Sequence, residues 1–149
     1  MRVRHLISKD KQLVSDTDWR TDGMQPRHVP VYKQTRPTPR GWKWRSGRAD
    51  AANDSDDDRF ILVARCSPER DKWNAWLLYV LNPQPTSASL VARFEHHGDH
   101  PGLHAHSDCE RSGIEEGASS IDNLARFPDP GNERRHIVWD ERRFWEAAK

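Results

Sequence analysis

Three consecutive strand patterns between residues 59 and 95 constrain the fold of this chain most strongly. Residues 59–66 (RFILVARC) are rich in β-branched and aromatic side chains, and residues 73–81 (WNAWLLYVL) are apolar on both faces. The alternating residues 88–95 (ASLVARFE) come next, and short segments of turn-forming residues separate the three runs. Strands that follow one another at hairpin distance pair in antiparallel order, so this region predicts a β-meander.

Alternation predicts which side chains share a face of these strands. Over residues 88–95 it separates Arg93 and Glu95 from an apolar set consisting of Ala88, Leu90, Ala92 and Phe94. A tight turn is expected around residues 100–102, and residues 103–108 (LHAHSD) then alternate again. We therefore expect a fourth, short strand with His104, His106 and Asp108 on one face.

The sequence beyond residue 109 is typical of helices. Residues 119–122 (SSID) resemble a helix N-cap that leads into an amphipathic run ending before Pro128, and Asp140 can cap a last helix. Because the strands come first and the helices follow, we predict an α+β fold. Its antiparallel β-meander has about four strands, with C-terminal helices packed on one face.

Charge is distributed unevenly along the 149 residues, although the net charge is only +1. Residues 1–48 contain twelve lysines and arginines against four aspartates, whereas residues 49–58 contain five aspartates and no large apolar side chain. This distribution predicts three parts: a basic, Trp- and Pro-rich N-terminal segment at 1–48, a mobile acidic loop at 49–58, and an α+β core domain at 59–149.

Composition also excludes several classes of protein. No run of eighteen apolar residues is present, and the first residues lack the apolar core of a secretory signal. Two cysteines, Cys66 and Cys109, are too few for a disulfide framework. We therefore expect a cytoplasmic protein without a membrane partner.

Aromatic residues alternate with cations in the second half of the N-terminal segment. Bases stack on aromatic rings while cations follow the phosphate backbone, so this pattern predicts a nucleic-acid surface. The candidate residues are Arg40, Trp42, Lys43, Trp44 and Arg45. The alternative is that Trp42 and Trp44, which are two residues apart, point to one side of a strand and are buried in the core.

Five of the eight histidines lie within eleven residues, at positions 96, 97, 100, 104 and 106. Such density indicates proton transfer, metal coordination or pH sensing, because histidine titrates near neutrality. A metal site would use His97, His104 and His106 to hold Zn or Mn, although their spacing matches no standard zinc pattern. Two further alternatives are a nucleophilic Cys109 beside the histidines and a surface hairpin with incidental histidines.

Metal-free cleavage of RNA is the catalytic hypothesis that we favour from these residues. RNA supplies its own nucleophile in the 2′-hydroxyl, so an enzyme needs a base, an acid and a cation near the phosphate. His104 and His106 are the candidate acid and base, Arg93 is a candidate phosphate ligand, and Glu95 or Asp108 can orient an imidazole. This chemistry requires no cofactor.

The motifs Arg93-Phe94-Glu95 and His104-Ala105-His106, joined by a turn containing Gly98, resemble those of the TumE-type ribonuclease toxins of bacterial toxin–antitoxin pairs. The resemblance covers residues 59–149. It implies an RNA-cleaving toxin neutralised by an antitoxin protein, with His104 and His106 in the His-x-His position of the family. The alternative from a different class is a non-catalytic metal- or partner-binding module whose N-terminal segment contacts nucleic acid.

Overall fold

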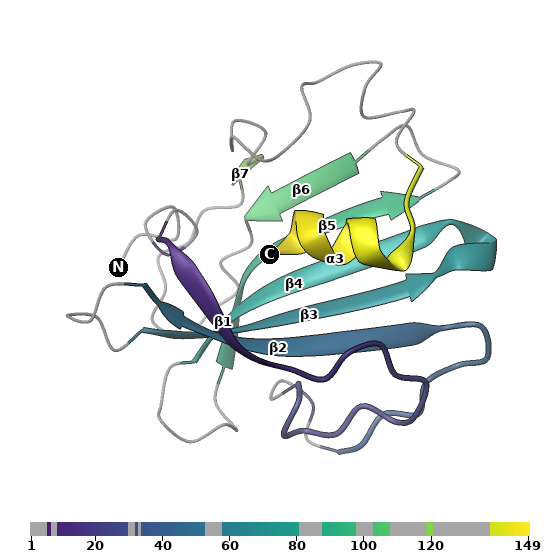
Figure 1. The fold of residues 1–149 in the computed structure, drawn as a ribbon, viewed down its shortest axis with the longest axis horizontal. Coiled ribbons are helices and arrows are strands. Elements are labelled where there is room, and N and C mark those ends of the chain that lie inside the picture. The colour runs from purple at the N-terminus through teal and green to yellow at the C-terminus, as the bar shows by residue number, and fades with distance from the viewer. Residues whose placement is uncertain are drawn as a thin grey trace.

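The computed structural model describes residues 6, 9–29, 32, 34–52, 58–80, 88–97, 103–107, 119–120 and 138–149. Within these ranges it gives the backbone alone for residues 89, 94, 97, 103–107 and 119–120. The described part of the chain is dominated by one antiparallel sheet and ends in a single α-helix (Figure 1).

The sheet of the described residues has seven strands, and each strand pairs with the one that follows it in sequence. The antiparallel meander expected from the sequence is therefore confirmed, but the expected number of about four strands is wrong. The three additional strands come from the N-terminal third and from residues 119–120. The strands are β1 (Lys11–Asp16), β2 (Lys43–Ala51), β3 (Arg59–Ser67), β4 (Lys72–Val80), β5 (Ala88–His97), β6 (Leu103–Ser107) and β7 (Ser119–Ser120).

One C-terminal α-helix, α3 (Glu141–Ala148), replaces the several helices expected from the sequence, as far as the structure describes the chain. Asp140 caps it as predicted, since its Oδ1 accepts a hydrogen bond of 2.7 Å from the backbone N–H of Arg143. Residues 119–120 form strand β7 instead of a helix N-cap. The helix expected over residues 121–127 lies outside the described residues.

Side chains cover both faces of the sheet, but they come from different parts of the chain. Helix α3 covers one face of the sheet, which we call the helix face (Figure 1). Phe144 and Trp145 of α3 are fully buried there against Ala64, Cys66 and Trp73. On the opposite face, which we call the loop face, Met24 and Val29 pack on the centre of the sheet. Their contacts there include Trp44, Ile61, Val63 and Leu78. Burying these apolar side chains is the main force that stabilises the fold.

Two parts of the N-terminal third, strands β1 and β2, belong to the sheet. Strand β2 runs through residues 48 and 49, where the composition predicted a boundary, and pairs with β3 from Lys43 to Asp50. Trp44 in this strand is fully buried, as one of the two alternatives required, but Trp42, which the same alternative placed in the core, is only half-buried. Residues 53–57, the centre of the predicted acidic loop, lie outside the described residues.

A β-bulge in β5 changes the alternation expected for that strand. Its register with β4 shifts between Leu77 and Leu78, which leaves Val91 as the extra residue. As a result Leu90 packs with the cluster on the loop face, whereas Ala92 packs with Phe60 on the helix face. The expected single apolar face of Ala88, Leu90, Ala92 and Phe94 is therefore wrong, because a bulge reverses the alternation partway along the strand.

Candidate active site

Two pairs of chemically active residues lie directly opposite each other on β5 and β6. Arg93 pairs with His106, and Glu95 pairs with His104. Directly paired residues of an antiparallel ladder lie on the same face of the sheet, so the backbone brings these four positions together. Asp108, the fifth catalytic residue expected from the sequence, lies outside the described residues.

The same register extends the site across β4 and β3. Glu95 lies opposite Asn74, and Asn74 in turn lies opposite Arg65, while Arg93 lies opposite Trp76. We call this set the polar row; it consists of Arg65, Asn74, Trp76, Arg93 and Glu95. Each of its side chains is half-buried. Since Trp76 lies opposite Val63 of the loop-face core, the polar row and the positions of His104 and His106 all belong to the loop face.

Two buried polar atoms of the polar row have no hydrogen-bond partner among the described residues. They are Nε of Arg93 and Oδ1 of Asn74. A buried donor or acceptor without a partner costs about 1–3 kcal/mol, so a ligand or water that bonded to these two atoms would be stabilised here. The Arg93 guanidinium also forms no ion pair within the described ranges, which leaves its charge available to an anion.

An aromatic ring lies beside the second arginine of the polar row. The guanidinium of Arg65 stacks on Trp42 at 4.7 Å from the ring centroid, and Trp42 is half-buried just before the start of β2. Together with Trp76, it gives the loop face two indoles close to two arginines. Rings of this kind next to guanidinium groups are what stacked bases and phosphates bind in single-stranded nucleic acid complexes.

The five predicted nucleic-acid contacts do not form one surface. Strand alternation sends Lys43 and Arg45 to the helix face, where Lys43 donates to Glu141 at 2.6 Å and Arg45 donates through Nε to Asp16 at 2.8 Å. Trp44 is fully buried and its Nε1 donates to the backbone oxygen of Asp22 at 2.7 Å, so it cannot stack a base. Arg40 is exposed. Two members of the set adjoin the polar row: Trp44 lies directly opposite Arg65 but is buried, whereas the half-buried Trp42 stacks on Arg65.

His96 is separated from the polar row by the sheet itself. It is 4 % exposed, and its Nε2 lies 3.3 Å from Oδ2 of Asp71, at the turn between β3 and β4. Its ring also lies edge-on to Trp139, on the helix face. His96 therefore contributes to packing beside α3 and cannot reach a substrate on the loop face.

The described structure offers no evidence that either cysteine acts as a nucleophile. Burial raises the pKa of the Cys66 thiol to about 12, and the nearby carboxylate of Glu141 acts in the same direction. A thiol with such a pKa is protonated and inert at neutral pH. Cys109 lies outside the described residues.

The described side chains do not complete the metal site predicted from the sequence. The described side chains contain no group of three or more His, Cys, Asp and Glu able to hold a metal ion. His97 lies two positions after Glu95 on β5, and His104 lies opposite Glu95, so both occupy positions on the loop face. A site formed by His97, His104 and His106 remains a prediction, because the structure gives only the backbone of these residues.

Sequence reasoning missed Arg65, Asn74 and Trp76. The signal for Asn74 was its amide in the otherwise apolar run of residues 73–81. Burying a polar side chain in a strand costs free energy unless a hydrogen bond compensates for it. No local signal pointed to Arg65. Only its register opposite Asn74 brings it to the site.

Comparison with known proteins returned no match to a family model, to a curated protein or to a solved structure. The resemblance to TumE-type toxins thus rests on the motifs in the sequence. The helices that the structure describes include none long and apolar enough to cross a membrane.

Proposed function

We propose that this protein cleaves RNA by metal-independent general acid–base catalysis on the loop face, with His104 and His106 as the acid and the base. The observation that carries the proposal is the register of β5 and β6, in which Glu95 is the direct partner of His104 and Arg93 is the direct partner of His106. This pairing places a carboxylate beside the position of His104 and a guanidinium beside the position of His106. A carboxylate can orient an imidazole for proton transfer, and a guanidinium can bind the phosphate.

The reaction begins with removal of a proton from the 2′-hydroxyl of RNA by one imidazole. The 2′-oxygen attacks the adjacent phosphorus, negative charge develops on the non-bridging oxygens, and the bond to the 5′-oxygen of the next nucleotide breaks. The second imidazole, in its protonated form, donates a proton to that leaving oxygen. The products are a 2′,3′-cyclic phosphate and a 5′-hydroxyl.

The polar row supplies the remaining functions of the proposal. Arg93, whose Nε has no described partner, stabilises the developing charge on the phosphate, and Glu95 orients His104. Asp108 keeps its proposed role in orienting an imidazole. Trp42 and Trp76 offer rings to the flanking bases, and the Arg65 guanidinium above Trp42 attracts the backbone. The substrate that suits these groups is single-stranded RNA.

Substitution of the two histidines tests the proposal. His104→Ala and His106→Ala should each reduce cleavage of single-stranded RNA by purified protein at least about 100-fold in excess chelator. Ser107→Ala is the matched control, because Ser107 lies on the same strand but pairs with Ala92 of the helix face. Undiminished cleavage by both histidine variants would remove the proposal.

The resemblance to TumE-type toxins adds two elements to the proposal. One is a partner antitoxin protein that neutralises the enzyme, and the other is a cytoplasmic location, where its RNA substrates are found. Co-expression separates these elements from the chemistry. A toxic wild-type chain and a harmless His106→Ala variant are expected in the absence of the partner.

A second candidate function is a non-catalytic metal- or partner-binding module. It is favoured by the loop-face positions of His97 and His104, which are diagonal neighbours across β5 and β6. Elemental analysis of protein purified without an affinity tag distinguishes the two functions. Stoichiometric zinc or manganese in a protein that leaves RNA intact would support the module, whereas metal-free protein that cleaves RNA supports the enzyme.

A further inference from the structure

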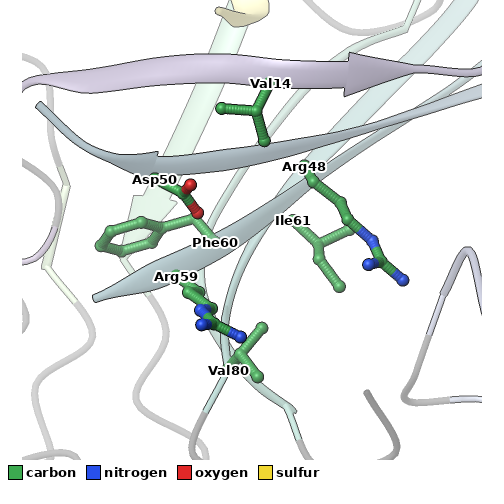
Figure 2. A pocket seen from close by; sticks show the side chains of 7 residues that line it. All are labelled: Val14, Arg48, Asp50, Arg59, Phe60, Ile61 and Val80. Atoms are coloured by element: carbon green, nitrogen blue, oxygen red, sulfur yellow. The ribbon is translucent and has the colours of Figure 1, made fainter. Parts of the chain in front are cut away.

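A pocket of about 260 Å³ opens on the sheet near β1, away from the polar row. Figure 2 shows its lining side chains, which come from the first four strands. Apolar groups and two arginines share this lining with one carboxylate. The residues are Val14, Arg48, Asp50, Arg59, Phe60, Ile61 and Val80.

An irregularity in β1 and the register between β2 and β3 bring the lining residues of the pocket together. The register of β1 with β2 shifts between Leu13 and Ser15, so that Val14 has no direct partner and is 57 % exposed. Arg48 lies directly opposite Ile61, and Asp50 lies directly opposite Arg59. The two arginines are therefore diagonal neighbours on the same face, with the buried side chain of Ile61 between them (Figure 2).

The two guanidinium groups serve no evident structural role. Arg48 and Arg59 are exposed, and neither forms an ion pair or a side-chain hydrogen bond within the described residues. Asp50 is likewise exposed and unpaired there. With two positive charges against one negative charge, the pocket is complementary to an anion, and Ile61 and Val80 offer an apolar surface beside it.

We infer that this pocket binds a small organic phosphate monoester, with the phosphate between Arg48 and Arg59 and an apolar group on Ile61 and Val80. A single guanidinium can donate hydrogen bonds to both oxygens of a carboxylate. A phosphate monoester has three terminal oxygens and nearly two negative charges at neutral pH, so it can accept hydrogen bonds from both arginines at once. Asp50 weakens binding by repelling the phosphate.

Calorimetric titration with phenyl phosphate tests the inference, because this probe joins one phosphate to one apolar ring. We expect saturable binding at one site, weaker by about tenfold or more in both Arg48→Gln and Arg59→Gln. Asp50→Asn should bind more tightly, and Arg142→Gln, an exposed arginine on α3, is the control that should bind as the wild type does. Arg93→Gln, which lacks the proposed phosphate ligand of the active site, should keep this binding, and that result separates the pocket from the active site.

Three results would overturn the inference. They are the absence of saturable binding, equal binding by the wild type and both pocket arginine variants, and binding of benzoate as tight as that of phenyl phosphate. The arginines are exposed and unpaired within the described residues, so their removal should leave the fold intact. Circular dichroism of each variant checks this directly.

Discussion

Glu95 on β5 lies directly opposite His104 on β6. A carboxylate in this position can hold the imidazole ring and stabilise its charged form during proton transfer. Replacement by the uncharged isostere, Glu95→Gln, should lower kcat for RNA cleavage about tenfold or more while KM changes little. Glu95→Asp, which keeps the charge, should recover part of the loss. A rise in KM with unchanged kcat would instead indicate a role in substrate binding.

The Arg93 guanidinium forms no ion pair within the described residues, which predicts a loss of activity without a loss of stability on substitution. Arg93→Gln removes the cation that we propose to contact the phosphate and should lower kcat/KM about 100-fold. Since no described ion pair is broken, the midpoint of urea unfolding should hardly change. Arg93→Lys restores the charge but not the planar fork, and intermediate activity is expected. A large decrease in stability would show that Arg93 is structural.

Substitutions of Trp42 and Trp44 are expected to affect two different properties, RNA affinity and folding stability. Trp44→Ala empties a fully buried position and should cost about 3–5 kcal/mol in the free energy of unfolding. Trp42→Ala removes a half-buried ring at the edge of the polar row and should weaken binding of single-stranded RNA by about 1–3 kcal/mol. Fluorescence anisotropy in a His106→Ala background measures the binding without cleavage. Equal RNA affinity with and without Trp42 would contradict its assigned role.

The Asp16–Arg45 pair between β1 and β2 predicts how stability depends on pH. Partial burial by itself raises the pKa of Asp16, but hydrogen bonds from the Arg45 guanidinium and the Asp18 backbone N–H outweigh it, and the net pKa is lowered. Because the folded pKa lies below the unfolded value of about 3.9, the stabilisation is present above that pH and is lost as the pH falls through the folded pKa.

Asp16→Asn should therefore unfold more easily than the wild type at pH 7, by about 1 kcal/mol, and the difference should shrink below about pH 4. Urea titrations at a series of pH values measure it. Asp50→Asn is the control, since the Asp50 carboxylate is exposed and unpaired in the described part of the chain. A difference that stays constant from pH 7 to pH 2 would show that ionisation of Asp16 is not its cause.

The raised pKa of Cys66 predicts that this thiol is unreactive in the folded protein. With a pKa of about 12, only about one thiol in ten thousand is ionised at pH 8. In a Cys109→Ser background, iodoacetamide should leave the native protein unmodified and label it fully in denaturant, as followed by mass spectrometry. Rapid labelling of the native protein would contradict the burial of Cys66 beneath α3.

The parts of the fold that sequence reasoning found are those encoded by neighbouring residues. Residues 59–66 and 73–81 contain enough β-branched and aromatic side chains to specify β3 and β4, and turn residues between them specify a hairpin. Asp140 signalled the start of α3 for an equally local reason, since a cap needs only the N–H groups of the next residues.

The parts that it missed depend on partners distant in sequence. Strand β2 has one large apolar side chain, Trp44, and becomes a strand by pairing with β1 and β3. The bulge at Val91 reverses the faces of β5, and no local pattern announces it. For the candidate site, alternation singled out Arg93, Glu95, His104 and His106. The amide of Asn74 in an apolar run was a local signal that could have added this residue. Only the register could add Arg65, because it depends on which strands are neighbours.

The chemical nature of the RNA ends tests the central proposal most directly. A labelled single-stranded RNA is incubated with the purified protein in excess chelator, beside the same oligonucleotide carrying 2′-deoxynucleotides at the positions of cleavage. The proposal predicts fragments with 2′,3′-cyclic phosphate and 5′-hydroxyl ends, and resistance of the deoxy-substituted strand. Fragments with 5′-phosphate ends that appear only with a divalent metal, or intact RNA under all conditions, would contradict it.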